Sequence, residues 1–393
     1  MLSAAPGRTD PGHAQPDRPV VVAFLLQDFE LGGISQWIYT VCAELHRTDP
    51  GRFAFHFICT HGWVIQERFA RVGTPVFLGR EGRAPNWLVW LRVQRYLQRL
   101  RPDIIQFSNL KPYRDLCYRV RPPVIIERKA AMRTVGRYDS RGVDAIISQN
   151  RQVMEALRDL PVPQFLVYHG VDLDGLASVV PNRAGFGPDD FIVGQVARLS
   201  PGKNQRMLID VVARVRQRHP RVKLVLVGGA TRQAGAVDLL PELREHARRL
   251  GVEAVFTGAL NDPAPYIAGF NVGTCTTTRA CGEGAPRLLI EPMAFGIPCV
   301  TTDAGATNEV IEDGVNGFLV PDDDVPGMAD RIERLLLDEA LYRRLSHRAR
   351  ETVERRFNIR TQARQVRDIF LSLLAQSTRP RSRRRMPEPI SAH

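Results

Sequence analysis

The sequence predicts an α/β protein with two domains, each a parallel β-sheet covered by helices on both faces. Its 393 residues are too many for one ordinary core and suit two units of about 150 to 200 residues. Short β-branched runs alternate with amphipathic stretches along the chain, as in parallel sheets. Turn residues cluster at 181–188, between two such series. We therefore place the domain boundary there.

Each series is interpreted as one Rossmann-like unit, and the two units are expected to face each other across a cleft. In the first, strands are predicted at 19–26, 53–59, 75–78, 103–107, 123–126, 145–148 and 165–168, with a helix at about 35–45. In the second, they are predicted at 191–197, 222–227, 254–256, 272–276, 298–301 and 317–320, followed by helices at 326–337, 340–355 and 359–375. Ligands of such folds bind beyond the carboxyl ends of the strands, so the cleft is the expected site.

The boundaries divide the chain into a first domain at 19–180 and a second at 181–355. Residues 1–18 are rich in Pro, Gly and polar side chains and lack the apolar segment of a secretory signal, so a disordered lead is expected. The tail at 376–393 is rich in arginine and has too few apolar residues to fold.

Charge and cysteine content restrict the partners. The formal net charge is +12, and a third of it lies in the tail. We interpret this charge as favouring solubility, with attraction to anionic lipid headgroups as the alternative. The basic residues are spread among helices without a nucleic-acid-binding motif, so we expect no nucleic-acid partner. The six cysteines form no CxxC pair and no metal-like spacing with histidine. The sequence also has no apolar run of about 18 residues, so these features predict a cytoplasmic protein. If the basic residues bind anionic lipid headgroups, we expect it to be peripheral at the inner face of the membrane.

The most informative motif is the segment 281–296. Pro286 fits the first position of a helix and Gly296 the residue just past its end, so Glu283 precedes the helix and Glu291 lies within it. A helix N-terminus has unpaired N–H groups and partial positive charge, which suit a diphosphate. A carboxylate two turns on, at Glu291, suits a ribose diol.

Two further motifs follow strands. Arg198 and Lys203 flank the turn Ser200-Pro201-Gly202, and two fixed cations can stabilise a departing nucleoside diphosphate without a metal ion. Gly32 and Gly33 follow the first strand, and glycines let backbone N–H groups approach a ligand closely.

Taken together, the spacing of Glu283 and Glu291, the pair Arg198 and Lys203, the segment 169–172 (His-Gly-Val-Asp) and the two glycines resemble the retaining glycosyltransferases of family four, or group one, which have the GT-B fold. The similarity covers nearly the whole ordered chain and is most specific over 283–320. It implies transfer of a hexosyl-type group from a nucleoside-diphosphate sugar, with no cofactor and no metal.

The resemblance also implies roles for individual residues. Glu283 contacts the donor sugar and Glu291 holds the ribose, while Arg198 and Lys203 bind the donor phosphates and assist leaving-group departure. The donor-binding residues also include Gly284, Pro286, Arg287 and Leu288. Backbone amides near Arg287 and Leu288 contact the distal phosphate, and Gly32 and Gly33 of the other lobe close over this phosphate. The last helix, in the segment 356–375, is expected to cross back onto the first domain.

The acceptor side departs from the family. A family histidine near the reacting sugar is replaced by Glu127-Arg128-Lys129, and His61 and Glu127 are our candidates for acceptor contact. The acceptor is expected to be a glycan, a lipid-linked sugar or a small molecule. Two other functions stay open: a non-catalytic nucleotide-sugar-binding or scaffold subunit, and a GT-B sugar-nucleotide epimerase.

Two further segments have simpler interpretations. Asp322-Asp323-Asp324 is interpreted as a run of solvated loop acids. The segment 87–101 is interpreted as a helix packed in the core, and its alternative is a basic helix at a membrane surface.

Overall fold

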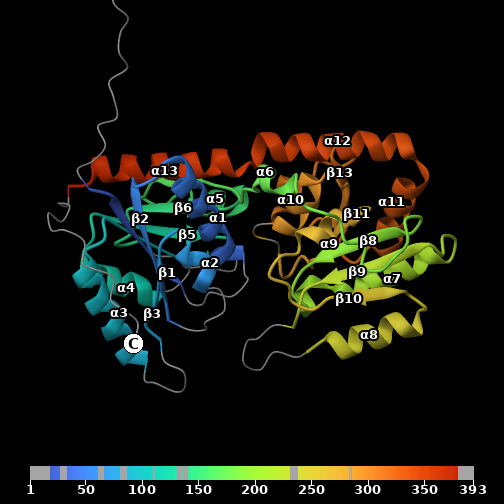
Figure 1. Ribbon diagram of the computed structural model, residues 1–393, viewed down its shortest axis with the longest axis horizontal. Helices are drawn as coiled ribbons and strands as arrows, with labels where there is room; N and C mark the ends of the chain where they lie inside the picture. The colour runs from blue at the N-terminus through green and yellow to red at the C-terminus, as the bar shows by residue number, and fades with distance from the viewer. Residues whose placement is uncertain are drawn as a thin grey trace, which may run out of the picture.

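The computed structural model describes residues 18–26, 33–60, 66–79, 86–108, 111–130, 135, 140–230, 238–282, 284 and 286–378. Nearly all of the predicted lead and most of the predicted tail lie outside these residues. The described chain forms two α/β lobes that lie side by side, with two long C-terminal helices along one edge of both (Figure 1). The predicted architecture is confirmed.

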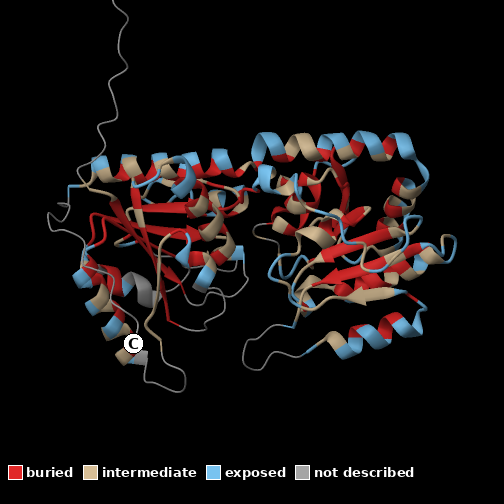
Figure 2. Ribbon diagram, in the orientation of Figure 1, coloured by how far each residue is buried: buried red, intermediate tan, exposed pale blue. Residues whose placement is uncertain are grey.

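The first lobe is built on a seven-stranded sheet in the order β3-β2-β1-β4-β5-β6-β7, parallel throughout. The strands are β1 (Val20–Leu26), β2 (Phe53–Cys59), β3 (Thr74–Phe77), β4 (Ile104–Ser108), β5 (Val124–Lys129), β6 (Ala145–Ser148) and β7 (Gln164–Leu166). Its helices are α1 (Gly33–Thr48), α2 (Gln66–Ala70), α3 (Asn86–Leu100), α4 (Lys111–Val120), α5 (Arg151–Ala156) and α6 (Leu173–Leu176). The central strands are buried on both faces because helices cover both (Figure 2).

The second lobe has a six-stranded parallel sheet in the order β10-β9-β8-β11-β12-β13. Its strands are β8 (Phe191–Val196), β9 (Val222–Val227), β10 (Ala254–Phe256), β11 (Val272–Cys275), β12 (Cys299–Thr302) and β13 (Gly317–Val320). The helices are α7 (Gln205–Arg216), α8 (Leu240–Arg249), α9 (Ala264–Ala268), α10 (Arg287–Ala294), α11 (Val325–Leu337) and α12 (Glu339–Arg356). In both sheets the strand order reverses beside the first strand, which places the ligand-binding crevice there.

The last helix, α13 (Ile359–Gln376), crosses back to the first lobe as expected. Its apolar face carries Val366, Ile369 and Phe370, which belong to the same buried cluster as α1 and the strands β1 and β2. Helix α12 packs instead within the second lobe, through residues such as Leu341 and Leu345. The final segment of the sequence therefore completes the core of the first lobe.

Two boundaries differ from the sequence-based expectation. Strand β5 was expected to end at Ile126 but continues through Glu127, Arg128 and Lys129, all three of them buried. Charged residues usually mark a strand end, and here Glu127 and Lys129 stay inside because they pair with each other at 2.8 Å. Pro286 was expected inside α10 but lies one residue before it, since its ψ of 62° is not helical.

One face of helix α3 packs in the core, as interpreted for 87–101, while the other face is exposed. Val89, Val93 and Leu97 are buried against the sheet, while Trp87 at the start of the helix is 63% exposed. Among the described helices, none is both long enough and apolar enough to cross a bilayer.

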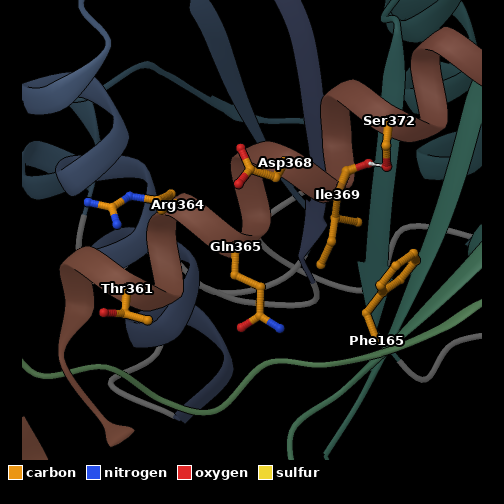
Figure 3. A pocket seen from close by; sticks show the side chains of 7 residues that line it. All are labelled: Phe165, Thr361, Arg364, Gln365, Asp368, Ile369 and Ser372. Carbon is orange, nitrogen blue, oxygen red and sulfur yellow. Dashed lines mark hydrogen bonds between the residues drawn. The ribbon is translucent and has the colours of Figure 1, made fainter. Parts of the chain in front are cut away.

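A hollow of about 520 Å³ lies between β7 and α13, lined by the seven side chains of Figure 3. Gln365 at this hollow donates from Nε2 to the carbonyl of Leu166, 2.7 Å away, and so covers a backbone group at the edge of the sheet. None of the predicted donor residues lines it.

Candidate functional site

The loop before α10 is fixed against the first lobe by one side chain. Asn150 Nδ2 donates to the carbonyl of Gly284, 2.5 Å away, and to the carbonyl of Ala130 just beyond β5, 3.0 Å away. Its Oδ1 accepts from Val153 N at 2.7 Å and so caps the N-terminus of α5. The predicted donor loop thus lies at the carboxyl end of β5. Sequence reasoning missed Asn150, although an asparagine before an amphipathic stretch is an N-cap signal.

Helix α10 presents its N-terminus at this junction. The N–H groups of Leu289 and Ile290 bond to the carbonyl of Pro286, at 2.9 and 3.2 Å. The amides of Arg287 and Leu288 precede these bonds and are the ones a helix start offers to an anion. The side chain of Leu288 is packed in the core, so any contact it makes with a ligand comes from its backbone.

The Lys203 turn lies against the loop that follows β11. Lys203 Nζ donates to Thr277 Oγ1 at 3.4 Å, and the carbonyl of Lys203 accepts from Thr276 Oγ1 at 2.8 Å. A Cβ on Gly202 would fall 2.6 Å from Cys281 Sγ, so only glycine permits this approach. Lys203 is therefore brought to the segment 276–282 that leads into the donor loop. Arg198, at the end of β8, has an exposed side chain.

The first lobe brings Gly33 and His169 to the same junction. Gly33 is the first residue of α1, and a Cβ built on it would lie 3.9 Å from His169 Nε2. Burial, then the charges of Arg128 and Arg287, hold the pKa of His169 well below its usual value. His169 is therefore neutral at physiological pH.

A second set of bonds joins the lobes at Glu309. Its carboxylate accepts from the backbone N–H groups of Arg151 and Gln152, at 2.8 and 3.1 Å, and from Tyr168 Oη at 3.0 Å. Burial, followed by this carboxylate, raises the pKa of Tyr168. Gln152 Nε2 also donates to the carbonyl of Gly305 at 2.7 Å. Sequence reasoning missed Glu309 and Tyr168, because residues far apart in sequence give no local signal of contact.

The structure therefore brings Gly33, Gly284, Pro286 and the α10 residues Arg287, Leu288 and Glu291 to one junction of the lobes, while Lys203 packs against the segment 276–282 of the second lobe. Glu291 is engaged by Arg287 on the same helix at 2.5 Å. Glu283, Gly32 and His61 lie outside the described residues, and their roles stay predictions. Glu127, the other acceptor candidate, is buried with Lys129.

The three consecutive acids after β13 each hold a neighbouring group. Asp322 accepts from Arg279 N at 2.7 Å, Asp323 from Asn204 Nδ2 at 2.8 Å, and Asp324 from Gly327 N at 2.9 Å. Among the described residues, no three or more His, Cys, Asp or Glu side chains form a metal-binding group. Asp323 is exposed, as expected of a solvated loop acid, whereas Asp322 and Asp324 are partly buried and Asp324 caps α11.

Residues 190–338 match the family model described as glycosyl transferases group 1. The chain is 32% identical over 202 residues to a Bacillus subtilis protein with the provisional name glycosyltransferase EpsD, covering 51% of this chain and 50% of that one. It is 29% identical over 208 residues to the phosphatidyl-myo-inositol mannosyltransferase of Mycobacterium leprae, covering 52% of each. The chain thus spans about half the length of these curated relatives.

Among solved structures, HepE of Anabaena in complex with UDP and glucose superposes with a TM-score of 0.74 at 20% identity. The superposition covers 90% of this chain and all of HepE. This likeness shows a two-lobed glycosyltransferase fold of the GT-B type. The family match lies within the second lobe, over residues 190–338, and is to the family that the resemblance implied.

Proposed function

We propose that the protein transfers a hexosyl-type group from a nucleoside-diphosphate sugar to a glycan, lipid-linked or small-molecule acceptor, with retention at the anomeric carbon and without a metal ion. The observation that carries the proposal is the junction of the lobes, where the loop before α10 meets the first lobe at Asn150. Gly33 lies near His169 of the same junction, and Lys203 packs against the segment that leads into this loop, which supports a donor site there. The N–H groups at the start of α10, together with the basic side chains of Arg198 and Lys203, are suited to a bound diphosphate.

The chemistry follows from charge. As the bond between the anomeric carbon and the diphosphate breaks, negative charge grows on the leaving oxygen. Lys203, held at Thr277, and Arg198 can stabilise that charge together with the amides of Arg287 and Leu288. These groups supply positive charge of the kind that a divalent cation supplies in metal-dependent transferases, which is why we include metal independence in the proposal.

The test is a transfer assay on the full chain with a panel of nucleoside-diphosphate sugars and candidate acceptors. We expect release of the nucleoside diphosphate together with a glycosylated product, an unchanged anomeric configuration by NMR, and no loss of rate in EDTA. Saturable binding without turnover would favour the scaffold alternative, and isomerised donor without transfer would favour an epimerase. A product of inverted anomeric configuration would contradict the proposed retention, and inhibition by EDTA would contradict the proposed metal independence.

We further propose that the acceptor is presented at an anionic membrane surface. Trp87 is 63% exposed at the start of α3, and Arg92, Arg95, Arg99 and Arg101 of the same segment are exposed. Aromatic and basic side chains on one element are suited to an anionic interface. Sedimentation with phosphatidylglycerol vesicles tests this: binding should weaken with added salt and in Trp87→Ala, and phosphatidylcholine vesicles serve as the control.

A further inference from the structure

Arg128 is a fully buried arginine for which the described residues provide no hydrogen-bond partner. Its exposed fraction is 0%, and its Nε, Nη1 and Nη2 bond to no atom of the part of the chain that the structure describes. Its guanidinium carbon lies 4.5 Å from the centroid of the Trp37 ring. The Trp37 ring is itself fixed, because its Nε1 donates to the carbonyl of Tyr168 at 3.1 Å. Arg128 is therefore held in position by packing and by the ring face, while its five N–H donors are unused.

Such an arrangement is unfavourable in the absence of a ligand. Burial of a charge without hydrogen bonds is strongly destabilising, and buried polar groups in proteins are nearly always paired. Burial lowers the pKa of Arg128 to about 9, so the side chain still carries its charge at neutral pH. A cation–π contact replaces only part of the lost hydration.

The neighbouring polar groups are neutral and supply no counter-charge. His169 has a buried, unpartnered Nε2, and burial, then the charges of Arg128 and Arg287, lower its pKa. Gln149, two residues beyond the Ile147 that pairs with Arg128, has a buried, unpartnered Nε2. The nearest carboxylate along the chain, Glu127, is paired with Lys129. Alternate residues of β5 point to opposite faces, so Glu127 faces away from Arg128. The described residues thus provide this cluster with positive charge and hydrogen-bond donors but no anion.

The cluster adjoins the proposed donor site. Arg128 is two residues from Ala130, whose carbonyl shares the Asn150 amide with the carbonyl of Gly284. His169 lies near the first residue of α1, Gly33, and is influenced by Arg287 of the second lobe. The cluster therefore lies beside the junction where the donor loop meets the first lobe.

We infer that Arg128 binds an oxyanion of the bound substrate, a phosphate or a carboxylate, on the first-lobe side of the donor loop. A guanidinium fork matches two oxygens of such a group, and buried charge-assisted hydrogen bonds are the strong ones. The inference rests on the proposed function, because it assigns the oxyanion to a glycosyl donor or acceptor. Three sources share this chemistry: the diphosphate of the donor, an acidic group on the transferred sugar, and an anionic acceptor.

The probes are inorganic phosphate and D-glucuronate, titrated into the full chain at constant ionic strength with the thermal unfolding midpoint as the readout. The variants are Arg128→Met and Arg128→Lys. Arg68→Met is the matched control, because Arg68 lies 3.9 Å over the Tyr39 ring of the same helix α1 and donates to Gln36 at 3.0 Å, outside the cluster. We expect at least one probe to raise the midpoint of the wild type and of Arg68→Met, with half-maximal effect requiring at least tenfold more probe in Arg128→Met. The probe concentration for half-maximal effect in Arg128→Lys should lie between those of the wild type and Arg128→Met, since lysine keeps the charge but lacks the planar guanidinium fork.

Competition identifies the source. If UDP or another nucleoside diphosphate that binds removes the Arg128-dependent response, the oxyanion is the donor diphosphate; if the response persists, it belongs to the sugar or the acceptor. A response to glucuronate alone points to a carboxylate. Equal responses of the wild type and Arg128→Met to both probes would overturn the inference, as would no response to either probe.

Stability of the ligand-free protein separates binding from a purely structural role. Replacing an unpaired buried charge by an apolar side chain of similar length is expected to leave the midpoint unchanged or to raise it. A clear fall in the midpoint of Arg128→Met, with probe responses unchanged, would show that the residue serves packing alone. Failure of every nucleoside diphosphate to bind the wild type would instead count against the proposed function and leave the probe result standing.

Discussion

Arg287 holds Glu291 through a single carboxylate oxygen. Both Nε and Nη2 of the arginine donate to Oε1, at 2.8 and 2.5 Å, across one turn of α10. The second oxygen receives no hydrogen bond within the part of the chain that the structure describes. Arg287 thus orients the carboxylate and leaves one oxygen for a ligand, which is the arrangement that a ribose diol needs.

Glu291→Ala should weaken nucleoside-diphosphate binding. A bound diol would lose its acceptor, and Arg287 would lose its partner, at about 1–3 kcal/mol, or about 5- to 150-fold in Kd. Calorimetry with the nucleotide that binds the wild type measures this change. Glu339→Ala is the matched control, because Glu339 forms an i,i+4 pair with Arg343 on the exposed face of α12. Unchanged affinity in Glu291→Ala would contradict its assignment to the ribose.

Lys203→Met should reduce turnover more than it reduces donor affinity. If Lys203 stabilises charge that develops on the leaving diphosphate, its loss lowers kcat by about 10²-fold or more. Steady-state transfer kinetics provide the measurement. Lys223→Met is the control, since Lys223 pairs with Glu253 at 2.6 Å on β9. A variant with normal kcat and raised KM would show that Lys203 only binds the donor.

His56 should make the protein sensitive to acid. Burial lowers its pKa from 6.5 to about 4, so the folded state binds fewer protons than the unfolded state between these values. The free energy of unfolding therefore has its full value above about pH 6.5 and falls, by an amount on the order of 3 kcal/mol, as the pH is lowered toward 4. His56→Gln should flatten this part of the profile of unfolding free energy against pH. The exposed His347→Gln should leave the slope unchanged, and a wild-type slope in His56→Gln would exclude this origin.

Phe370→Ala should destabilise the first lobe although residue 370 lies near the end of the chain. The ring is fully buried and meets Phe53 edge to face, with centroids 6.3 Å apart. Removing it leaves a cavity, and the expected loss is about 3–5 kcal/mol by denaturant unfolding. Leu337→Ala is the control, because Leu337 is 67% exposed. A loss below about 1 kcal/mol would mean that α13 packs loosely.

The alternation of strands and helices was readable because it depends on local patterning. Strands β2, β6, β9, β10 and β13 begin and end at the predicted residues. The error at β5 arose where charged residues are buried, since their ion pair and ring contact depend on side chains brought together by folding. Local sequence carries the hydrophobic period and does not reveal which charges will be paired.

The site was predictable in its second lobe and much less so in its first. Pro286, Arg287 and Glu291 lie in one continuous segment whose spacing is informative. The contacts of Asn150 with Gly284 and of Tyr168 with Glu309 join residues more than 130 positions apart. No periodicity encodes such pairs. The unpaired state of Arg128 was equally invisible, because it depends on burial.

The return of α13 to the first lobe has a consequence for biosynthesis. While the ribosome is still extending the second lobe, strands β1 and β2 have already emerged, yet the helix that covers part of their apolar face has not been made. The nascent chain must carry that uncovered surface for most of its translation. Premature termination shortly before residue 359 would release a product whose beginning, rather than its end, is left incomplete and open to aggregation.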